Sequence, residues 1–580
     1  MSKSDASVEQ LVSMIERGQL RLPEMQRRYV WRSTRVRDLL DSLYRGYPSG
    51  AILLWETSEN VPLQDFAVSQ QGNPYQNSLL LLDGQQRLTS LSAVIRGEPV
   101  TVRGRRRPLD LLFNLEHPDH LVVVTEVEED STDEDEDDND TDDDMEDIES
   151  DEADSSEDEL FKRFNRMTFV VASRKLEQSP TWVKVSEVFK SESDLPFLKR
   201  AGIVELDDPR SEKYSKRLAK LRGIRKYMYR MDILESTLSY EEVTEIFVRV
   251  NSLGAKLRSS DLALAQITAK WRGSLAIFQA FQKECADDGF DLDLGVFLKN
   301  LVVFATGQSR FLTVNSLPVE ALKQAWEECR HGMEYSINFL KNNVGIDNPV
   351  LLSSNLLLIT LAYYGHCRHY KIGPDEAVRL RHWALLANAK GRYSRGSGDT
   401  LIEQDLNTLK KDTPDSPEGY ADELLDRLRT QVGRLDILPE ELEGRNQSSA
   451  LFKTMFLAFR DAGAKDWQSN IIISLRHKGA RHRLQFHHIF PKATLRASYT
   501  RREVNDISNL SFIGGNTNRA ISASPPSIYF GPILDNGGQV LMNSQCIPTD
   551  PALLDVQTYK AFLIERRKRI SQRLNEFLGV

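Results

Sequence analysis

The stretch between residues 126 and 159 limits what this chain can fold into more than any other feature. It holds 23 Asp and Glu residues, neither Lys nor Arg, and few apolar residues. Such a segment cannot bury enough apolar surface to offset the entropy lost on ordering, so we predict a disordered acidic loop. Strand-like apolar runs stand on both sides, at Leu111 to Val127 and at Phe169 to Ala172. The loop is therefore predicted to be an insertion inside one domain.

The acidic loop also disguises the charge of the remaining chain. The whole sequence carries a formal net charge of −10, from 75 basic and 85 acidic residues. Without the 23 acidic residues of the loop, 62 acidic residues face 75 basic ones, a balance of about +13. A basic body of this kind leaves nucleic acid open as a partner, which the overall charge alone would argue against.

Length and cysteine content set further bounds. At 580 residues the chain is too long for one hydrophobic core, so two to four domains are expected. Its four cysteines, none at the spacing of a zinc knuckle, indicate free thiols of a reducing cytoplasm. The polar N-terminus shows no secretion signal, and the longest apolar run, Leu356 to Tyr364, is under half a bilayer span. We expect a cytoplasmic protein with no membrane partner, in which this run is a core helix.

Apolar periodicity predicts three parts. Near the N-terminus, helix-spaced apolar residues accompany two buried strand candidates, at 51–55 and 79–82, and the second strand leads into a helix from Gln85 to Ile95. Helical patterns dominate the middle of the chain, and the end returns to a strand-strand-helix pattern. The fold class that follows is a helix-rich multidomain α+β protein. Its predicted parts are an α/β domain over 5–270, a helical domain over 271–435 and a C-terminal domain over 436–580.

Two adjacent histidines near the C-terminus carry the most chemical information. A strand leads into His487 and His488, Asn509 opens a second strand, and Asn518 lies in a short helix after a Gly-Gly turn. A neutral imidazole can take a proton from water, a divalent cation can stabilise a leaving oxygen, and a carboxamide can orient the imidazole. This order of groups fits a one-metal phosphodiesterase site. A lone histidine pair beside a proline would more often cap a strand, so the two asparagines decide in favour of a site.

The same residues resemble the HNH-like C-terminal nuclease domain of the GmrSD-type restriction enzymes, whose signature is His-x-x-Pro, then Asn-Leu, then Asn. The resemblance covers about residues 440–575 and implies a ββα-metal fold. By position it makes His488 the general base and Asn509 the residue that orients it, with His487 and Asn518 as ligands of Mg²⁺ or Mn²⁺. Many HNH enzymes have an Asp where this chain has His487. A basic cluster before the motif, which includes Arg481 and Arg483, is either a solvated hairpin or an edge that grips DNA phosphates. Arg519, which follows Asn518, could contact the phosphate.

A second motif, Asp83-Gly84-Gln85-Gln86-Arg87, stands between an apolar strand and a helix. Gly84 allows a tight turn, the helix start offers free backbone amides to an anion, and Arg87 offers a fork for phosphate oxygens. The amides of Gln85 and Gln86 can hold a base edge or a water molecule. The structural alternative is that Asp83 and Arg87 merely pair at the helix start.

Together with the segments Pro23 to Trp31 and Phe247 to Gly254, this motif resembles the ParB/sulfiredoxin-like domain that opens the same restriction family. The resemblance covers about residues 5–270 and implies a domain that binds and hydrolyses a nucleoside triphosphate and helps to sense modified DNA. No Gly-x4-Gly-Lys-Ser/Thr segment occurs, so a P-loop mechanism is unsupported, and no motif chooses between GTP and ATP. The implied nucleotide-binding residues are Gln26, Arg27, Asp83, Gly84, Gln85, Gln86, Arg87, Arg249 and Asn251, of which Asp83, Gln85, Gln86 and Arg87 are also the implied catalytic residues of hydrolysis.

The two resemblances together imply a nucleotide-regulated, metal-dependent DNA endonuclease of bacterial anti-phage defence, with phage DNA, modified or not, as its partner. The alternative is a regulatory DNA-binding protein that hydrolyses nucleotide and carries an inactive HNH module. A DNA-binding scaffold without enzymatic activity is a third class. The acidic loop is then either a solvating spacer or a DNA mimic that covers a basic surface. The sequence leaves open the modification that is read, nicking against double-strand cleavage, and assembly into homo-oligomers.

Overall fold

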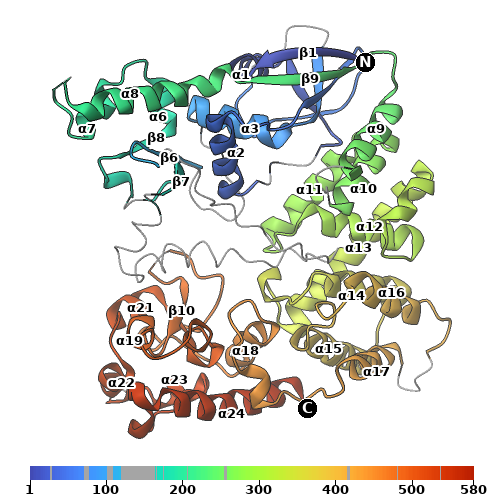
Figure 1. Cartoon of the computed structure of the whole chain (residues 1–580). Coiled ribbons are helices and arrows are strands. Elements are labelled where there is room, and N and C mark those ends of the chain that lie inside the picture. The colour runs from blue at the N-terminus through green and yellow to red at the C-terminus, as the bar shows by residue number, and fades with distance from the viewer. Residues whose placement is uncertain are drawn as a thin grey trace. The chain divides into compact units, whose positions relative to one another are not determined.

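The computed structural model of the chain is shown in Figure 1. The predicted acidic loop, residues 126–159, lies outside the residues that the structure describes. Its predicted disorder and its role therefore stay predictions. The described chain divides into two compact units between Ile277 and Phe278, which are taken in turn below. The structure describes residues 1–580 apart from 27–28, 30, 71–77, 99, 101–108, 119–163, 165, 174–175, 206, 254–257, 415–418, 480 and 536.

A mixed six-stranded sheet forms the centre of the first unit. Its strand order is β1-β9-β3-β5-β2-β4. Antiparallel and parallel pairs alternate from one edge to the other. The strands are β1 (Ser2–Ser7), β2 (Leu20–Pro23), β3 (Ile52–Thr57), β4 (Leu63–Gln64), β5 (Ser78–Asp83) and β9 (Met228–Leu234).

The leucines of β5 explain why this strand is central. Successive strand residues face opposite sides of a sheet. Leu81 therefore joins the hydrophobic cluster on one side, while Leu80 and Leu82 join the cluster on the other side with Trp55. Burial on both faces is typical of an interior strand and confirms the strands predicted at 51–55 and 79–82.

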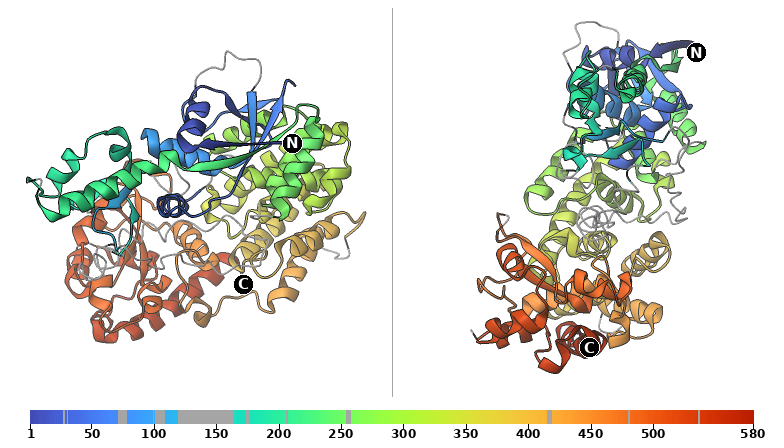
Figure 2. Two further views of the ribbon diagram at one scale, coloured as in Figure 1. Left: turned by 45° about the horizontal axis from the view of Figure 1, so that its top comes forward. Right: turned by 60° about the vertical axis from the view of Figure 1, so that its left-hand side comes forward.

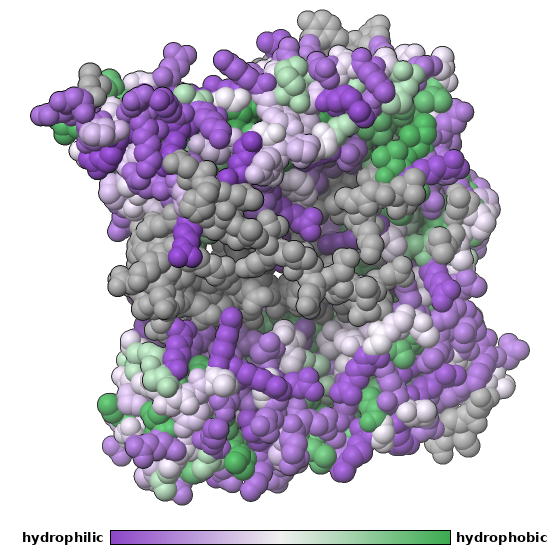
Figure 3. Space-filling view, viewed as in Figure 1, coloured by the Kyte–Doolittle hydropathy of each residue, from purple (hydrophilic) through white to green (hydrophobic). Residues whose placement is uncertain are grey.

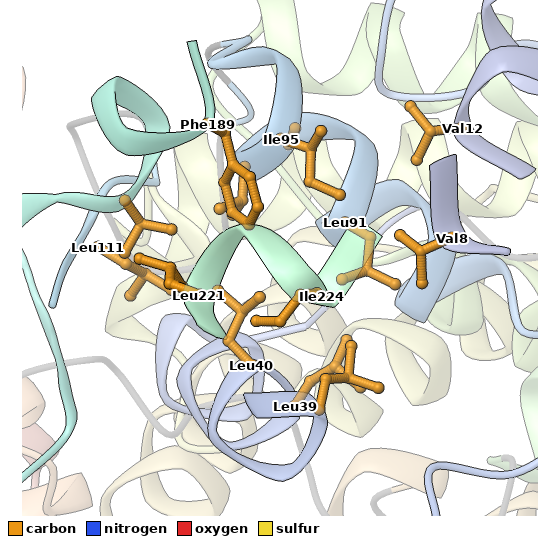
Figure 4. Packing of buried hydrophobic residues seen from close by; sticks show 14 of the residues in the cluster. Val8, Val12, Leu39, Leu40, Leu91, Ile95, Leu111, Phe189, Leu221 and Ile224 are labelled. Atoms are coloured by element: carbon orange, nitrogen blue, oxygen red, sulfur yellow. The ribbon is translucent and has the colours of Figure 1, made fainter. Parts of the chain in front are cut away.

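Helices cover both faces of this sheet (Figure 1). Figure 4 shows the packing on one side, where Val8, Leu40, Leu91 and Ile224 belong to the same buried cluster. The other side of the sheet packs against two helices, which start at Tyr240 and Ser259. Both helices contribute buried residues to the hydrophobic cluster on that side. The helices are α1 (Val8–Glu16), α2 (Ser33–Arg45), α3 (Gln85–Arg96), α9 (Tyr240–Leu253) and α10 (Ser259–Lys270).

A small three-stranded sheet, β7-β6-β8, completes the first unit. Strand β6 (Leu111–Asn114) pairs antiparallel with β7 (Phe169–Val171) and with β8 (Trp182–Lys184). The strands on either side of the long segment that contains the acidic stretch are therefore neighbours in one sheet. Helices α6 (Val185–Lys190) and α8 (Pro209–Arg222) contribute buried residues beside it.

The second unit is mostly helical. The apolar run from Leu356 forms α14, whose residues Leu357 to Gly365 are all buried, so the predicted core helix is confirmed. The expected division near residue 435 lies inside this unit and stays a prediction. The main helices are α12 (Leu294–Thr306), α13 (Val319–Phe339), α14 (Leu356–Cys367), α15 (Pro374–Ala389), α16 (Gly398–Leu409), α17 (Tyr420–Val432), α18 (Ala450–Asp461) and α24 (Tyr559–Leu578).

The C-terminal part of this unit surrounds a two-stranded hairpin, and its orange and red elements lie together in both views of Figure 2. Their shared core includes Phe490, Ile513, Tyr529 and Phe562. On the face of the molecule that Figure 3 shows, the described residues form a mostly hydrophilic surface with small hydrophobic patches. Within the described residues, no helix combines the length and apolar character needed to cross a bilayer.

Candidate active site

The histidine pair ends the first strand of a hairpin that runs directly into a helix. Strand β10 (Leu484–His488) pairs antiparallel with β11 (Leu510–Gly514), so that His487 lies opposite Ser511 and His488 opposite Leu510. Helix α21 (Gly515–Ile521) follows β11 without a loop and carries Asn518. The strand-strand-helix order predicted from the sequence is confirmed.

His487 lies in a buried slot. Its side chain is 4% exposed, and its ring meets those of Trp467 and Tyr529 edge to face, at centroid distances of 5.7 and 5.9 Å. Its Nδ1 lies 2.8 Å from Oδ1 of Asn518, and its Nε2 has no hydrogen-bond partner among the residues that the structure describes. Burial lowers the pKa of His487 to about 4, and the contact with Asn518 only partly opposes that shift. The ring is therefore neutral near pH 7, as a metal ligand must be.

The pair formed by His487 and Asn518 fits a divalent cation. Two ligand atoms that are each about 2.1 Å from one ion, at a right angle, lie about 3 Å apart. The 2.8 Å between Nδ1 and Oδ1 is close to this value. The described residues contain no group of three or more His, Cys, Asp or Glu side chains that could hold a metal. The pair would therefore need water and phosphate oxygens to complete the shell, as Mg²⁺ commonly does.

His488 has different neighbours from His487. Its Nε2 lies 3.2 Å from Oδ1 of Asn505, and Lys492 and Arg496 are close enough to influence it electrostatically. Burial lowers the pKa of His488 to about 3, and the positive charges of Lys492 and Arg496 act in the same direction. If Nε2 donates its proton to Asn505, Nδ1 is left as the atom that can accept a proton.

The lowered pKa of His488 predicts a flat pH profile. A base with a depressed pKa stays neutral until the pH approaches the lowered value, so acidification from about pH 7.5 to about pH 5.5 should not remove it. Initial nicking rates at saturating divalent cation across this range are expected to lack a transition near pH 6.5. A tenfold fall that follows one group with a pKa of 6.5 would contradict the environment described for His488.

The side chain of Asn509 contacts the backbone of Phe490 and Val504, and its predicted role in orienting His488 stays a prediction. Its Nδ2 donates to the backbone oxygens of Phe490 and Val504, both at 3.1 Å, and its Oδ1 accepts from Phe490 N at 2.9 Å. The side chain is fully buried. Asn509 therefore fastens both ends of the segment between the two strands.

Replacing Asn509 by Asp is expected to loosen this segment. The carboxylate can still accept from Phe490 N, but it loses both donors and faces two carbonyl oxygens in a buried site. We expect a loss of about 2–4 kcal/mol in stability and faster proteolysis between 490 and 505. Limited proteolysis of the variant beside Asn543→Asp, a change outside this segment, measures it. Equal cleavage of both variants at this segment would show that Asn509 does not hold it.

Three arginines surround the start of α21. The backbone oxygens of Arg483 and Arg481 accept from Gly515 N and Asn516 N, at 3.0 and 2.9 Å, while both arginine side chains are exposed. Arg519 is also exposed, and its Nε donates to Gly515 O at 3.1 Å. These side chains place positive charge beside the helix that carries Asn518, which is compatible with phosphate contacts.

In the first unit, the described side-chain contacts of the Asp-Gly-Gln-Gln-Arg motif are mostly with the protein itself. Gly84 has φ 103° and is the N-cap residue of α3, and a Cβ there would press against Ile52. Arg87 donates to the backbone oxygens of Ser49 and Ala51 and, at 3.0 Å, to Asp83. The guanidinium group of Arg87, which was predicted to bind phosphate, thus contacts protein acceptors in this structure. These contacts include the pairing of Asp83 with Arg87 at the helix start.

The glutamines of this region are also engaged with the protein. Gln26 Nε2 donates to the backbone oxygens of Leu81 and Leu82, and Gln86 Oε1 accepts from Trp31 N at 3.2 Å. Gln26, Gln85 and Gln86 are all buried. Asp83, whose side chain is 42% exposed, is more exposed than Arg87, at 14%.

Of the remaining predicted nucleotide contacts, the structure describes the side chain of Arg249 alone. Arg249 is exposed on α9 and pairs with Glu245 at 2.7 Å. Asn251 lies in the same helix, and the structure describes its backbone but not its side chain. Arg27 lies outside the described residues. The implied nucleotide site therefore stays a prediction.

Several residues of the C-terminal site were not predicted. Lys492 and Arg496 follow His488 at intervals of four residues, a spacing that could have drawn attention to them. The contacts of Asn505, Trp467 and Asp466 depend on tertiary structure, and no local pattern in the sequence marks them.

Comparison with known proteins places the first unit in a class. Residues 8–268 match the GmrSD restriction endonuclease N-terminal domain. Over these residues the chain is similar to the N-terminal domain of the GmrSD restriction endonucleases. The predicted resemblance over about residues 5–270 is confirmed.

The similarity to one relative extends through both units. The chain is 23% identical over 551 residues to the uncharacterized protein MJ0686 of Methanocaldococcus jannaschii, and the match covers 90% of this chain and 85% of that protein. The family match ends at residue 268, so the HNH character of the C-terminal part stays a prediction.

Proposed function

We propose that this chain is a nucleotide-regulated, metal-dependent DNA endonuclease of anti-phage defence, in which residues 484–521 form an HNH-like nuclease site. The observation that carries the proposal is the 2.8 Å separation of His487 Nδ1 and Asn518 Oδ1 inside a strand-strand-helix unit. Two neutral ligands at this spacing, beside a neutral histidine, are the groups that hydrolysis of a phosphodiester with one metal requires.

In the proposed mechanism, each residue has a separate task. A bound Mg²⁺ or Mn²⁺ would supply Lewis-acid stabilisation of the leaving oxygen. His487 and Asn518 would hold that ion. His488, neutral because burial lowers its pKa, takes the proton of the attacking water, and Asn505 holds the other ring nitrogen. Arg481, Arg483 and Arg519 add positive charge for the DNA backbone.

The role of the first unit rests on the family match. We propose that it binds a nucleoside triphosphate, GTP or ATP, senses the DNA, and controls the nuclease site through nucleotide hydrolysis. Asp83 is a partly exposed acidic group of the Asp-Gly-Gln-Gln-Arg motif, while Arg87, Gln26 and Gln86 shape the turn that presents it. This arrangement favours a bracing role for those three side chains over direct phosphate contacts.

Plasmid nicking tests the proposed function. Supercoiled DNA, from modified and unmodified phage sequences, is incubated with the full chain, with Mg²⁺ or Mn²⁺, and with GTP, ATP or neither. We expect nicking that requires the divalent cation, stops with EDTA, and changes with nucleotide. Absence of cation-dependent nicking on every DNA and with every nucleotide would reject the nuclease assignment.

A second candidate is a regulatory DNA-binding NTPase with an inactive HNH module. The observation that favours it is the burial of His487, which is 4% exposed and whose Nδ1 already contacts Asn518. A hydrogen bond between these groups would serve the fold equally well. Nucleotide turnover without nicking in the same assay would support this candidate.

A further inference from the structure

Asp466 connects a distant segment to the turn that presents Asn518. It lies between α18 and β10, and its side chain is 4% exposed. Its Oδ1 accepts from Gly514 N at 2.6 Å, and its Oδ2 accepts from Thr517 Oγ1 at 2.8 Å. Gly514 is the last residue of β11, and Thr517 immediately precedes Asn518. One carboxylate thus fastens both sides of the junction between β11 and α21.

The same carboxylate also organises its own loop. Oδ2 accepts from Ser469 N at 2.8 Å, from Ser469 Oγ at 2.7 Å and from Gln468 N at 3.3 Å. Burial acts to raise the pKa of Asp466, but hydrogen bonds from Gly514, Ser469 and Thr517 outweigh it and lower the pKa. A charged acceptor with this many donors is strongly held in one position.

The residue next to Asp466 reaches the other metal ligand. Trp467 packs its ring edge to face with His487 at 5.7 Å and stacks with Tyr529 at 6.2 Å. A single short segment therefore contacts the turn before Asn518 through one residue and the ring of His487 through the next. Displacement of this segment would alter the distance between the two ligand atoms.

We propose that Asp466 is a positioning residue that sets the separation of His487 and Asn518 and thereby the metal affinity of the site. This inference rests on the proposed function of the His487 and Asn518 pair. Asp466 does not touch the ion: its oxygens are occupied by the donors of the turn and of its own loop. Replacing a side chain that contacts and orients a metal ligand, without contacting the metal itself, typically changes metal affinity by about 10- to 100-fold.

Two matched hydroxyl variants separate positioning from general stability. Thr517 and Ser469 both donate to Asp466 Oδ2, at 2.8 and 2.7 Å, but only Thr517 belongs to the helix that carries Asn518. Thr517→Val is expected to raise the half-saturating Mn²⁺ concentration several-fold, and Ser469→Ala is expected to leave it within twofold of wild type. Asp466→Asn places an amide group opposite several donors. This change is expected to raise the half-saturating Mn²⁺ concentration about 10-fold or more.

The metal affinity is read in two ways with the full chain. Free Mn²⁺ is counted by electron paramagnetic resonance in the presence of a short DNA duplex, and nicking rates are measured against Mn²⁺ concentration. At saturating Mn²⁺ the variants should approach the wild-type rate, because the reacting groups are intact. Asp405→Asn, which removes another buried carboxylate of the same unit from its Arg392 partner, controls for loss of stability.

The outcomes are distinguishable. Equal effects of Thr517→Val and Ser469→Ala on the half-saturating Mn²⁺ concentration would overturn the positioning role. The role would also be overturned if Asp466→Asn, like Asp405→Asn, lost nicking rate equally at all Mn²⁺ concentrations. If wild type binds Mn²⁺ but does not nick DNA, the proposed nuclease function fails while the binding comparison still decides on Asp466. If Asp466→Asn does not fold, the comparison of the two hydroxyl variants decides.

Discussion

Replacing His488 by alanine is expected to slow cation-dependent nicking by about 100- to 10,000-fold, the usual contribution of a general base. The neutral ring beside Asn505 is the group in the hairpin that is left to accept a proton, since His487 is assigned to the metal. The variant should retain its Mn²⁺ affinity within a few-fold. Initial nicking rates at saturating Mn²⁺ measure the loss.

His477→Ala is the matched control for this prediction. His477 lies on the segment before β10, where its Nδ1 lies 3.1 Å from the backbone oxygen of His482. It contacts neither Asn505 nor Asn518 in the structure, and its replacement should leave the rate within a few-fold of wild type. A His488→Ala variant that nicks as fast as His477→Ala would remove the general base from the account.

Replacing Arg87 by alanine is expected to destabilise the first unit. Arg87 donates to the backbone oxygens of Ser49 and Ala51 and pairs with Asp83, and its side chain is 14% exposed. Its loss leaves partly buried acceptors without donors, which costs about 3 kcal/mol and lowers the melting temperature by about 5–10 °C. Arg87→Lys should recover little, because one ammonium group cannot reach acceptors that a planar fork connects. Thermal unfolding of the full chain, followed by calorimetry, measures the shift.

Arg249→Ala controls for the loss of positive charge. Arg249 is exposed and pairs within its own helix with Glu245, an interaction worth little. Its replacement should leave the melting temperature within about 1 °C of wild type. The opposite pattern for Arg87→Ala, an unchanged melting temperature with lost nucleotide binding, would restore the phosphate-binding role predicted from the sequence.

Local sequence patterns predicted the backbone of both candidate sites. The leucines at 79–82, the glycine at 84 and the helical pattern that follows define β5, its turn and α3 without reference to other segments. The hairpin and α21 were predicted on the same basis. In each case the strand or helix is specified by neighbouring residues, so a short window of sequence is sufficient.

The partners of the side chains could not be predicted in the same way. Arg87 binds backbone oxygens that lie nearly forty residues earlier, and Asn509 binds the backbone at Phe490. Asp466 accepts a hydrogen bond from Thr517, which lies 51 residues later in the sequence. Any of these polar groups could equally have faced a ligand. Tertiary packing decides which acceptor each donor meets, and no local spacing encodes that choice.

The account depends most on a metal ion shared by His487 and Asn518, and a double-mutant cycle tests this most directly. Rates of nicking at fixed Mn²⁺ are compared for wild type, His487→Ala, Asn518→Ala and the double variant. If both side chains hold one ion, each single change should lower the rate by about 100-fold or more, and the double variant should be little worse than the more severe single variant. Losses that multiply in the double variant, or single variants that keep the wild-type dependence on Mn²⁺, would contradict a shared ion.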